Sequence, residues 1–218
     1  MYKNCLKRIL DFVIALTVLV VASPVMLIIS VAIKMDSKGP VIFKQRRLGK
    51  AGKEFHMYKF RTMVVNAEAG GVYSDNKDPR VTKVGGVLRK TSLDELPQCI
   101  NILKGEMSLI GFRPPLTYHP WRWEEYTVEQ RRMFEVRPGI TGWAQVNGRK
   151  EVEWNKRIKL NVWYVDNVSF LLDVKIFFMT IFKVFTNADN ENVGATVVSK
   201  PGDKEETVIE EDKAKERV

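Results

Sequence analysis

The most marked pattern along the chain is an apolar run, Phe12–Ile33, in which only Thr17, Ser23 and Ser30 are polar. At about 1.5 Å per residue, a helix of this length just crosses a hydrocarbon core of about 30 Å. Ser23-Pro24 interrupts the run, because proline lacks an N–H and its ring crowds the carbonyl four residues earlier. A neighbouring serine hydroxyl is one of the groups that re-satisfy backbone atoms freed in this way. The run therefore predicts a membrane helix with a break at its middle.

Basic residues flank this apolar run on both sides. Lys/Arg-rich flanks of membrane segments stay in the cytoplasm. Two such flanks favour a re-entrant hairpin, in which two half-helices enter one leaflet and return. The alternative is a kinked N-terminal anchor that spans the membrane. A cleaved signal peptide is not favoured, because the run is too long and no small-residue cleavage site follows it. The basic residues are Lys3, Lys7 and Arg8 before the run, and Lys34, Lys38, Lys44, Arg46 and Arg47 after it.

The rest of the chain alternates short elements with Gly/Pro-rich loops. The expected strands are Val41–Gln45 and Glu54–Arg61. The segment Val84–Lys104 is expected to lead into a helix, and Trp121–Glu135 and Trp154–Asp166 are expected to be helices. The expected loops are Val64–Lys83 (loop or short helix), Ser108–Leu116 and Arg137–Arg149. The fold class is thus α/β and mostly helical, with a small β-hairpin or sheet, an N-terminal re-entrant helix-break-helix and interfacial amphipathic helices. The expected division is a hairpin at 1–38, a cytosolic catalytic domain at 39–187 and a polar, flexible tail at 188–218.

The segment Ser169–Phe185 is very apolar but carries a few charged residues. On a helix of 100° per residue, we expect Asp173, Thr180 and Lys183 within one arc, opposite Ile176 and Met179. Such a pattern is typical of an amphipathic helix that lies in the membrane interface. A core helix of the soluble domain is the alternative.

The composition favours an anionic partner. The net charge is +9 at pH 7, which suits phospholipid headgroups, nucleotide phosphates or nucleic acid. Nucleic-acid binding has no supporting motif, and the chain has neither a Walker A nor a G-x-G-x-x-G loop. Two cysteines give no disulfide framework. The two histidines, His56 and His119, have no metal-ligand spacing, so a zinc site is not expected.

The segment Thr91–Pro97 contains two adjacent carboxylates, Asp94 and Glu95. One interpretation is purely structural: Ser92 and Glu95 form a capping box, or Asp94 caps the following helix. The other is chemical. A helix start attracts phosphate and keeps a carboxylate ionised, as a nucleophile or metal ligand requires.

Basic residues on separate loops and strand ends form the second candidate constellation. Arginines on Gly/Pro-rich loops are good bidentate clamps for phosphate. The candidate substrate-binding residues are Lys59, Arg61, Arg89, Arg113, Arg137 and Arg149.

Several ordered motifs together resemble one family. They are Lys59–Met63, Leu88–Gln98, Asn101–Gly111 with Arg113-Pro114, and Arg137–Trp143. From about Lys7 to about Phe185 the chain is similar to the bacterial sugar transferases, the monotopic phosphoglycosyl transferases. It resembles their small form, without the extra N-terminal membrane helices of the large members.

The resemblance implies a reaction and a site. Family enzymes transfer a phospho-sugar from a UDP-sugar to a polyprenyl (undecaprenyl) phosphate and release UMP, the first membrane step of glycan assembly. Their re-entrant break maps onto Ser23-Pro24, and their catalytic dyad maps onto Asp94-Glu95, which also implies the ligands for Mg²⁺. In the implied ping-pong mechanism, Asp94 forms a covalent aspartyl phospho-sugar.

The resemblance also implies a cellular setting. It is the cytoplasmic face of the bacterial inner membrane, with membrane phospholipid and downstream glycosyltransferases as further partners and no nucleic acid. Two other functions remain open: a membrane-tethered nucleotide-sugar hydrolase and a non-catalytic scaffold that binds anionic lipid.

Overall fold

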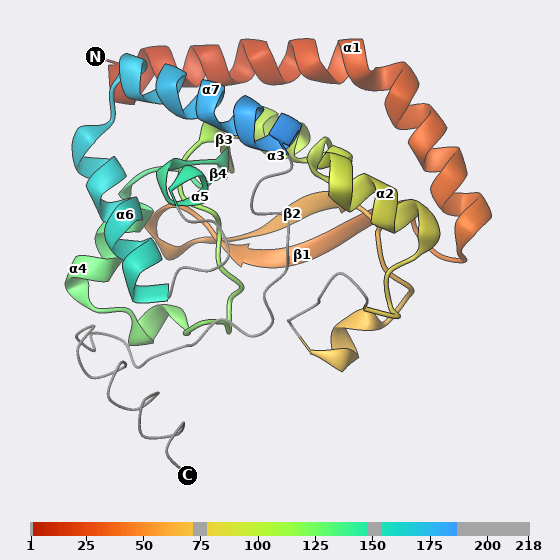
Figure 1. The fold of residues 1–218 in the computed structure, drawn as a ribbon. Helices are drawn as coiled ribbons and strands as arrows, with labels where there is room; N and C mark the ends of the chain where they lie inside the picture. The colour runs from red at the N-terminus through yellow and green to blue at the C-terminus, as the bar shows by residue number, and fades with distance from the viewer. Residues whose placement is uncertain (1, 72–77, 148–153, 187–218) are drawn as a thin grey trace.

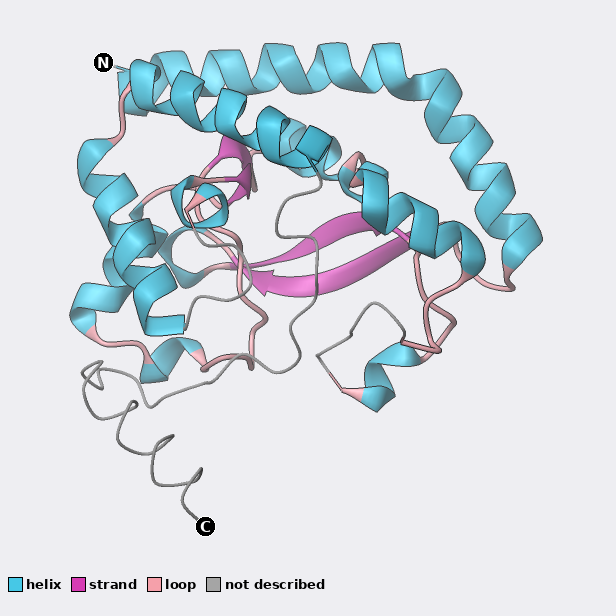
Figure 2. Cartoon of the chain, in the orientation of Figure 1, coloured by secondary structure: helices cyan, strands magenta, loops and turns pink. Residues whose placement is uncertain are grey.

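A long N-terminal helix arches over a small α/β body in the computed structural model of this chain (Figure 1). The structure describes residues 2–71, 78–147 and 154–186. The longer elements are α1 (Lys7–Asp36), β1 (Ile42–Leu48), β2 (Glu54–Phe60), α2 (Lys83–Thr91), α3 (Gln98–Lys104), β3 (Ser108–Ile110), α4 (Val128–Arg131), β4 (Gly139–Thr141), α5 (Trp143–Val146), α6 (Trp154–Asn167) and α7 (Phe170–Thr186). Single turns are η1 (Tyr2–Leu6), η2 (Lys50–Gly52), η3 (Ala67–Gly70), η4 (Leu93–Glu95), η5 (Trp123–Glu125) and η6 (Arg132–Glu135). Helix predominates over strand in the described chain (Figure 2).

Helix α1 is continuous through Pro24 and bends along its length (Figure 1). The prediction of two separate half-helices was therefore wrong in this respect: the helix is continuous where a break was expected. The Ser23 hydroxyl donates to the carbonyl of Val20, with 2.8 Å between the two oxygens. This is the carbonyl that loses its helical partner because Pro24 has no N–H. The serine therefore compensates for the proline, as the sequence predicts, and the helix continues.

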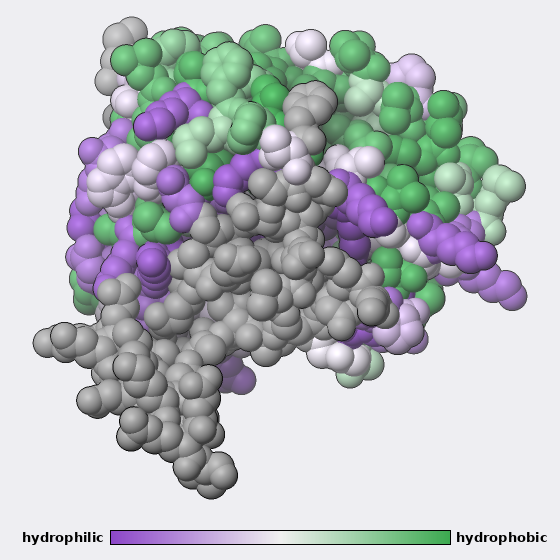
Figure 3. All heavy atoms as spheres, viewed as in Figure 1, coloured by the Kyte–Doolittle hydropathy of each residue, from purple (hydrophilic) through white to green (hydrophobic). Residues whose placement is uncertain are grey.

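Both halves of α1 pack against the same body. In the first half, Ala15 is fully buried in a cluster with Ile102 and Met107. In the second half, Ile29 and Ile33 pack with Phe60. The opposite side of α1 is apolar and exposed, and Figure 3 shows the hydrophobic side chains that gather along the top of the molecule. Of the described helices, α1 is the one long and apolar enough to cross a membrane.

Polar contacts fix each end of α1 to the body. Near the start, Lys7 forms an ion pair of 2.6 Å with the buried Asp173 of α7. The carboxylate of Asp11 accepts from the backbone N–H of Leu109, at 3.0 Å. At the far end, the carboxylate of Asp36 accepts from the backbone N–H of Val84, in the first turn of α2, at 2.9 Å. A helix tied at both ends to one body has a fixed position on that body.

The β-structure is two small sheets. Strands β1 and β2 form the predicted antiparallel hairpin, in register from Ile42↔Phe60 to Leu48↔Glu54. Strands β3 and β4 are parallel and lie in segments that were predicted as loops, so those predictions were wrong in part. Close backbone contact explains the glycines there, because a Cβ on Gly139 would lie 2.1 Å from the backbone nitrogen of Gly111. Only glycine permits this approach.

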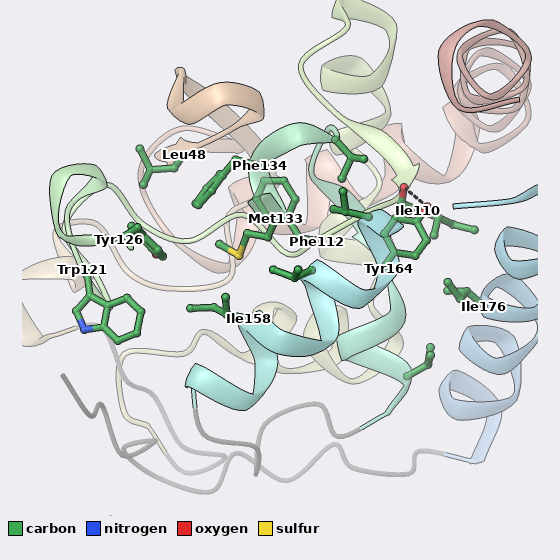
Figure 4. Close-up of a cluster of buried hydrophobic side chains, with 14 residues drawn as sticks. Leu48, Ile110, Phe112, Trp121, Tyr126, Met133, Phe134, Ile158, Tyr164 and Ile176 are labelled. Carbon is green, nitrogen blue, oxygen red and sulfur yellow. Dashed lines mark hydrogen bonds between the residues drawn. The ribbon is translucent and has the colours of Figure 1, made fainter. Parts of the chain in front are cut away.

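The main core joins β3, the segment 112–136 and helices α6 and α7. Phe112, Phe134 and Tyr164 are almost fully buried there, and Tyr164 points its hydroxyl toward the carbonyl of Ile110 (Figure 4). The helix predicted at Trp121–Glu135 is instead three short turns, η5, α4 and η6. Thr127 accepts from the N–H of Gln130 and thereby starts a new helix inside this segment.

The prediction that Ile176 and Met179 lie opposite the arc of Asp173, Thr180 and Lys183 on α7 was wrong, because at 100° per residue Ile176 falls inside this arc and Met179 beside it. Asp173 and Ile176 are both buried, and Thr180 shares a hydrogen bond of 2.8 Å with Thr141 of β4, so these residues lie on the inward face together. The exposed side is aromatic: Phe178 is 63% exposed and Phe182 is 68% exposed. The polar arc therefore faces the protein, where its groups have partners, and an apolar face is left outside.

Candidate active site

The two adjacent carboxylates lie in the tight turn between α2 and α3. Helix α2 ends at Thr91, its C-cap Ser92 has a φ of 57° in the left-handed region, and η4 (Leu93–Glu95) follows at once. Ser92 makes no side-chain capping bond, and the N-cap of α3 is Pro97. Both capping interpretations of this segment were therefore wrong. A non-glycine residue at positive φ is strained. The left-handed conformation of Ser92 reverses the chain after α2, and Asp94 and Glu95 lie in the turn that follows.

Lys59, at the end of β2, lies between the two carboxylates. Its ammonium is 2.7 Å from Glu95 Oε1 and 3.4 Å from Asp94 Oδ2. All three side chains are largely buried, with exposed fractions of 16% for Lys59, 18% for Glu95 and 11% for Asp94. One lysine therefore holds the dyad together and offsets part of its negative charge.

Arg113 completes the cluster from the other side. Its Nη2 lies 3.1 Å from Glu95 Oε1, and the side chain is 47% exposed. Phe112 before it forms a bridge with Pro138, and Pro114 after it is buried. The backbone on each side is therefore fixed, while the guanidinium reaches solvent next to the carboxylates.

These contacts decide the charge state of Glu95. Burial alone raises the pKa of a carboxyl group, but Lys59 and Arg113 lower the pKa of Glu95, and the net shift is strongly downward. In return Glu95 raises the pKa of Arg113. Glu95 is thus ionised at neutral pH because of two cations. The expected contribution of a helix start does not arise, since α3 begins only at Gln98.

The other predicted basic residues are placed differently. Arg89 donates to the hydroxyl of Thr62 at 2.9 Å and lies in the field of Asp94, which raises the pKa of Arg89 against the larger lowering by burial. Arg61 is buried and donates to the carbonyls of Ser37 and Lys38 at the end of α1. Arg137 donates to the carbonyl of Gly105. Arg149 lies outside the described residues.

The structure therefore brings Lys59, Asp94, Glu95 and Arg113 together, and it gives Arg61 and Arg137 main-chain partners at helix ends. Arg47 was not among the substrate-binding candidates predicted from the sequence. Arg47 donates to the carbonyl of Pro114, immediately after Arg113. The one signal for it in the sequence is its position two residues after Gln45, on the same face of a strand.

The oxygen donors of this cluster suit a hard cation. Among the described residues there is no group of three or more His, Cys, Asp or Glu side chains that could hold a metal ion. Asp94 and Glu95 supply two carboxylates, and magnesium typically binds through one or two carboxylates together with substrate phosphates. The pair therefore fits a site that magnesium and a phosphate ligand complete together.

Comparison with known proteins identifies the family. The model of the bacterial sugar transferase family matches residues 2–187. An uncharacterised sugar transferase, EpsL of Bacillus subtilis, is 46% identical over 183 residues, which is 84% of this chain and 88% of that protein. The UDP-glucose:undecaprenyl-phosphate glucose-1-phosphate transferase of Escherichia coli is 44% identical over 188 residues, 84% of this chain and 40% of that protein.

A further relative extends the range of sugars. The UDP-N-acetylgalactosamine-undecaprenyl-phosphate N-acetylgalactosaminephosphotransferase of Aeromonas hydrophila is 43% identical over 185 residues, 83% of this chain and 44% of that protein. The chain thus spans most of the first relative and less than half the length of the other two. The family match covers all four residues of the cluster around Glu95. This chain belongs to the bacterial sugar transferase family.

Proposed function

We propose that this chain transfers a sugar 1-phosphate from a UDP-sugar to undecaprenyl phosphate. The observation that carries the proposal is the buried cluster of Lys59, Asp94, Glu95 and Arg113 in a chain of this family. The relatives from E. coli and A. hydrophila are named as transferases with this acceptor. Their donors carry different sugars, so the proposal leaves the sugar open.

Asp94 is the proposed nucleophile. Its Oδ2 lies 3.4 Å from Lys59, whereas Glu95 takes the shorter contacts with both cations. A carboxylate oxygen of Asp94 attacks the sugar-bearing phosphorus, and the bond from this phosphorus to the bridging oxygen breaks. UMP leaves with that oxygen and its electron pair. A phosphate oxygen of the lipid then attacks the aspartyl phospho-sugar and restores the carboxylate, as in other two-step covalent transfers.

The cations support this chemistry in distinct ways. The partly exposed guanidinium of Arg113 is suited to bind the donor phosphates, and its fixed backbone keeps it aimed at the reacting group. Lys59 keeps the two carboxylates close despite their like charge. Asp94 and Glu95 are the residues that would hold magnesium, which would neutralise part of the diphosphate charge.

We also propose that α1 is re-entrant and that the body lies at the cytoplasmic face of the bacterial inner membrane. The support is that both halves of α1 pack on one body and both ends are tied to it. A straight span would need to detach one half, which would expose Ile33 or Ala15. The exposed apolar faces of α1 and α7 are the surfaces expected to enter lipid.

A donor screen tests the reaction. The protein, in detergent or nanodiscs with Mg²⁺, is incubated with individual UDP-sugars, with and without undecaprenyl phosphate, and UMP release is measured. Multiple turnover only in the presence of the lipid is the expected result. Steady turnover without lipid would identify a nucleotide-sugar hydrolase. Intact donors under every condition would favour the lipid-binding scaffold.

Asp94→Asn tests the nucleophile. Asparagine keeps the size of the side chain and cannot form an acyl phosphate, so we expect transfer to fall by at least about 10⁴-fold, the scale of about 5.5 kcal/mol. The wild-type protein, given the active donor without lipid, should carry a phospho-sugar on Asp94 that mass spectrometry of peptides locates. An adduct on another residue, or near-normal turnover of the variant, would contradict the mechanism.

Cysteine labelling tests the topology. We expect single cysteines at Tyr2 and Lys38 to be protected from a membrane-impermeant reagent in intact cells and to react after the membrane is opened. Labelling of one of them from outside would show that α1 spans the bilayer.

A further inference from the structure

Arg47 is a partly buried cation on β1 that the proposed mechanism does not use. Three of its nitrogens have protein acceptors: Nη1 donates to the carbonyl of Pro114 at 2.9 Å, and Nε and Nη2 donate to Gln45 Oε1 at 3.1 and 2.5 Å. Its neighbour Arg46 points the other way, with an exposed side chain paired to Glu54. Two adjacent arginines on one strand thus have very different surroundings.

The segment that Arg47 holds is the one that presents Arg113. The backbone N–H of Leu48 donates to the carbonyl of Pro115 at 3.0 Å, and Arg47 forms an antiparallel bridge with Leu116. Pro114 and Pro115 have no N–H, so this part of the segment can be fixed through hydrogen bonds only by its carbonyls. Arg47 and Leu48 supply the donors for those two carbonyls.

The arrangement also brings two guanidinium groups near each other. Burial lowers the pKa of Arg47, and the positive charge of Arg113 lowers it further, while Glu95 raises it. Arg113 for its part contacts Glu95, with 3.1 Å between its Nη2 and Oε1 of the carboxylate.

The side chain of Gln45 fixes the orientation of the Arg47 guanidinium. Its Oε1 accepts two of the three bonds, and its Nε2 donates to Glu68 of η3 at 3.0 Å. Because the amide nitrogen has an acceptor, the oxygen is directed toward Arg47. The chain of contacts therefore runs from Glu68 through Gln45 and Arg47 to the backbone beside Arg113.

We propose that Arg47 is a positioning residue, which holds the Pro114 carbonyl so that Arg113 stays against Glu95 and the donor phosphates. This proposal rests on the transferase function proposed above. Arg47 acts through Arg113 and does not itself touch the substrate.

Arg47→Lys is the direct test, since lysine keeps the charge but replaces the planar fork of guanidinium donors, which reaches Pro114 and Gln45 from three nitrogens, with a single ammonium. Small misplacement of a positioning group can cost up to about 10²-fold in rate. We expect kcat/KM for the UDP-sugar to fall by about 10-fold or more, with a melting temperature close to that of the wild type. Arg46→Lys is the matched control on the same strand and is expected to change kcat/KM by less than about twofold.

A double-mutant cycle with Arg113→Ala separates positioning from other roles. In the Arg113→Ala background, Arg47→Lys is expected to change kcat/KM by less than about threefold, because the group that it positions is gone. An equally large loss in both backgrounds would overturn the proposal and assign Arg47 an independent role. An unchanged kcat/KM in the single variant would also overturn it.

A measurement that does not depend on enzymatic activity tests the positioning role of Arg47 independently of the proposed function. Hydrogen exchange by mass spectrometry on a peptide that covers 111–118 is expected to be faster in Arg47→Lys than in Arg46→Lys. Gln45→Ala is expected to act in the same direction with a smaller effect. Equal exchange in the Arg47 and Arg46 variants would overturn the positioning role. Inactivity of the wild-type protein with every donor would count against the proposed function alone.

Discussion

Replacing Lys59 with methionine removes the cation that two carboxylates share while keeping most of the volume of the side chain. The contact of 2.7 Å with Glu95 corresponds to a gross attraction of about 6 kcal/mol at an effective dielectric constant of about 20. Desolvation of both groups opposes most of this attraction, and breaking a buried pair typically costs about 3–5 kcal/mol. Because Arg113 remains as a partner of Glu95, we expect a destabilisation of about 2–3 kcal/mol at pH 7.

The lowered pKa of Glu95 also predicts how the destabilisation caused by Lys59→Met changes with pH. The pKa of Glu95 is lowered in the folded protein, so its stabilising contribution is present at neutral pH. That contribution is lost as the pH falls below the ordinary carboxyl value of about 4.3. Lys59→Met removes much of the cause of the lowered pKa. The difference in the free energy of unfolding between the variant and the wild type should therefore shrink as the pH falls from 7 toward 3.5.

Denaturant unfolding in a mild detergent, followed by tryptophan fluorescence at both pH values, measures this difference. Lys53→Met is the control, because Lys53 is an exposed lysine just before β2. We expect it to change stability by less than about 0.5 kcal/mol at either pH. A Lys59→Met variant as stable as the wild type at pH 7, or a difference that grows on acidification, would refute the account of the cluster.

Three further predictions concern the site and the membrane surfaces. Arg113→Ala should lower kcat/KM by about 10²–10³-fold, the scale for a positioned charge, and normal kinetics would remove it from the site. Pro24→Ala restores a helical N–H donor and should move part of the population toward a spanning topology, measured by the cysteine labelling described above. Phe178→Asp with Phe182→Asp should weaken binding to vesicles without lowering the melting temperature, since both side chains are exposed; intact binding with a lower melting temperature would make α7 a core helix only.

The sequence predicted the elements that carry a local signal. The hairpin of β1 and β2 has turn residues between two strands in which apolar and polar positions mix, and α6 follows a helical period, so both appear close to where they were expected. Strands β3 and β4 are three residues each and pair in parallel across about thirty residues of sequence. A pairing so short and distant leaves no periodic pattern in either segment. Only the glycines at 111 and 139 mark the close approach of the two backbones.

The structure brings together four of the candidate site residues and gives others main-chain partners instead. Asp94, Glu95, Lys59 and Arg113 are brought together because each lies at an element end that the fold directs to one place. The presence of an arginine in the sequence does not show whether its side chain binds a phosphate or a backbone carbonyl. Arg61 illustrates this limit, since its donors go to backbone carbonyls at the end of α1. Such a role depends on tertiary contacts that no local pattern encodes.

The same short elements that hold the dyad also hold α1. At the end of β2, Lys59 contacts the dyad, and Arg61, just after the strand, binds the carbonyls of Ser37 and Lys38. Helix α2 makes a second connection, because its first turn bonds to Asp36 and its last residue leads into the turn of Asp94. Nine residues of helix span only about 13 Å. The dyad therefore has a fixed distance from the end of α1, and in the proposed membrane placement of α1 that distance sets the depth at which the lipid phosphate would reach a phospho-sugar on Asp94.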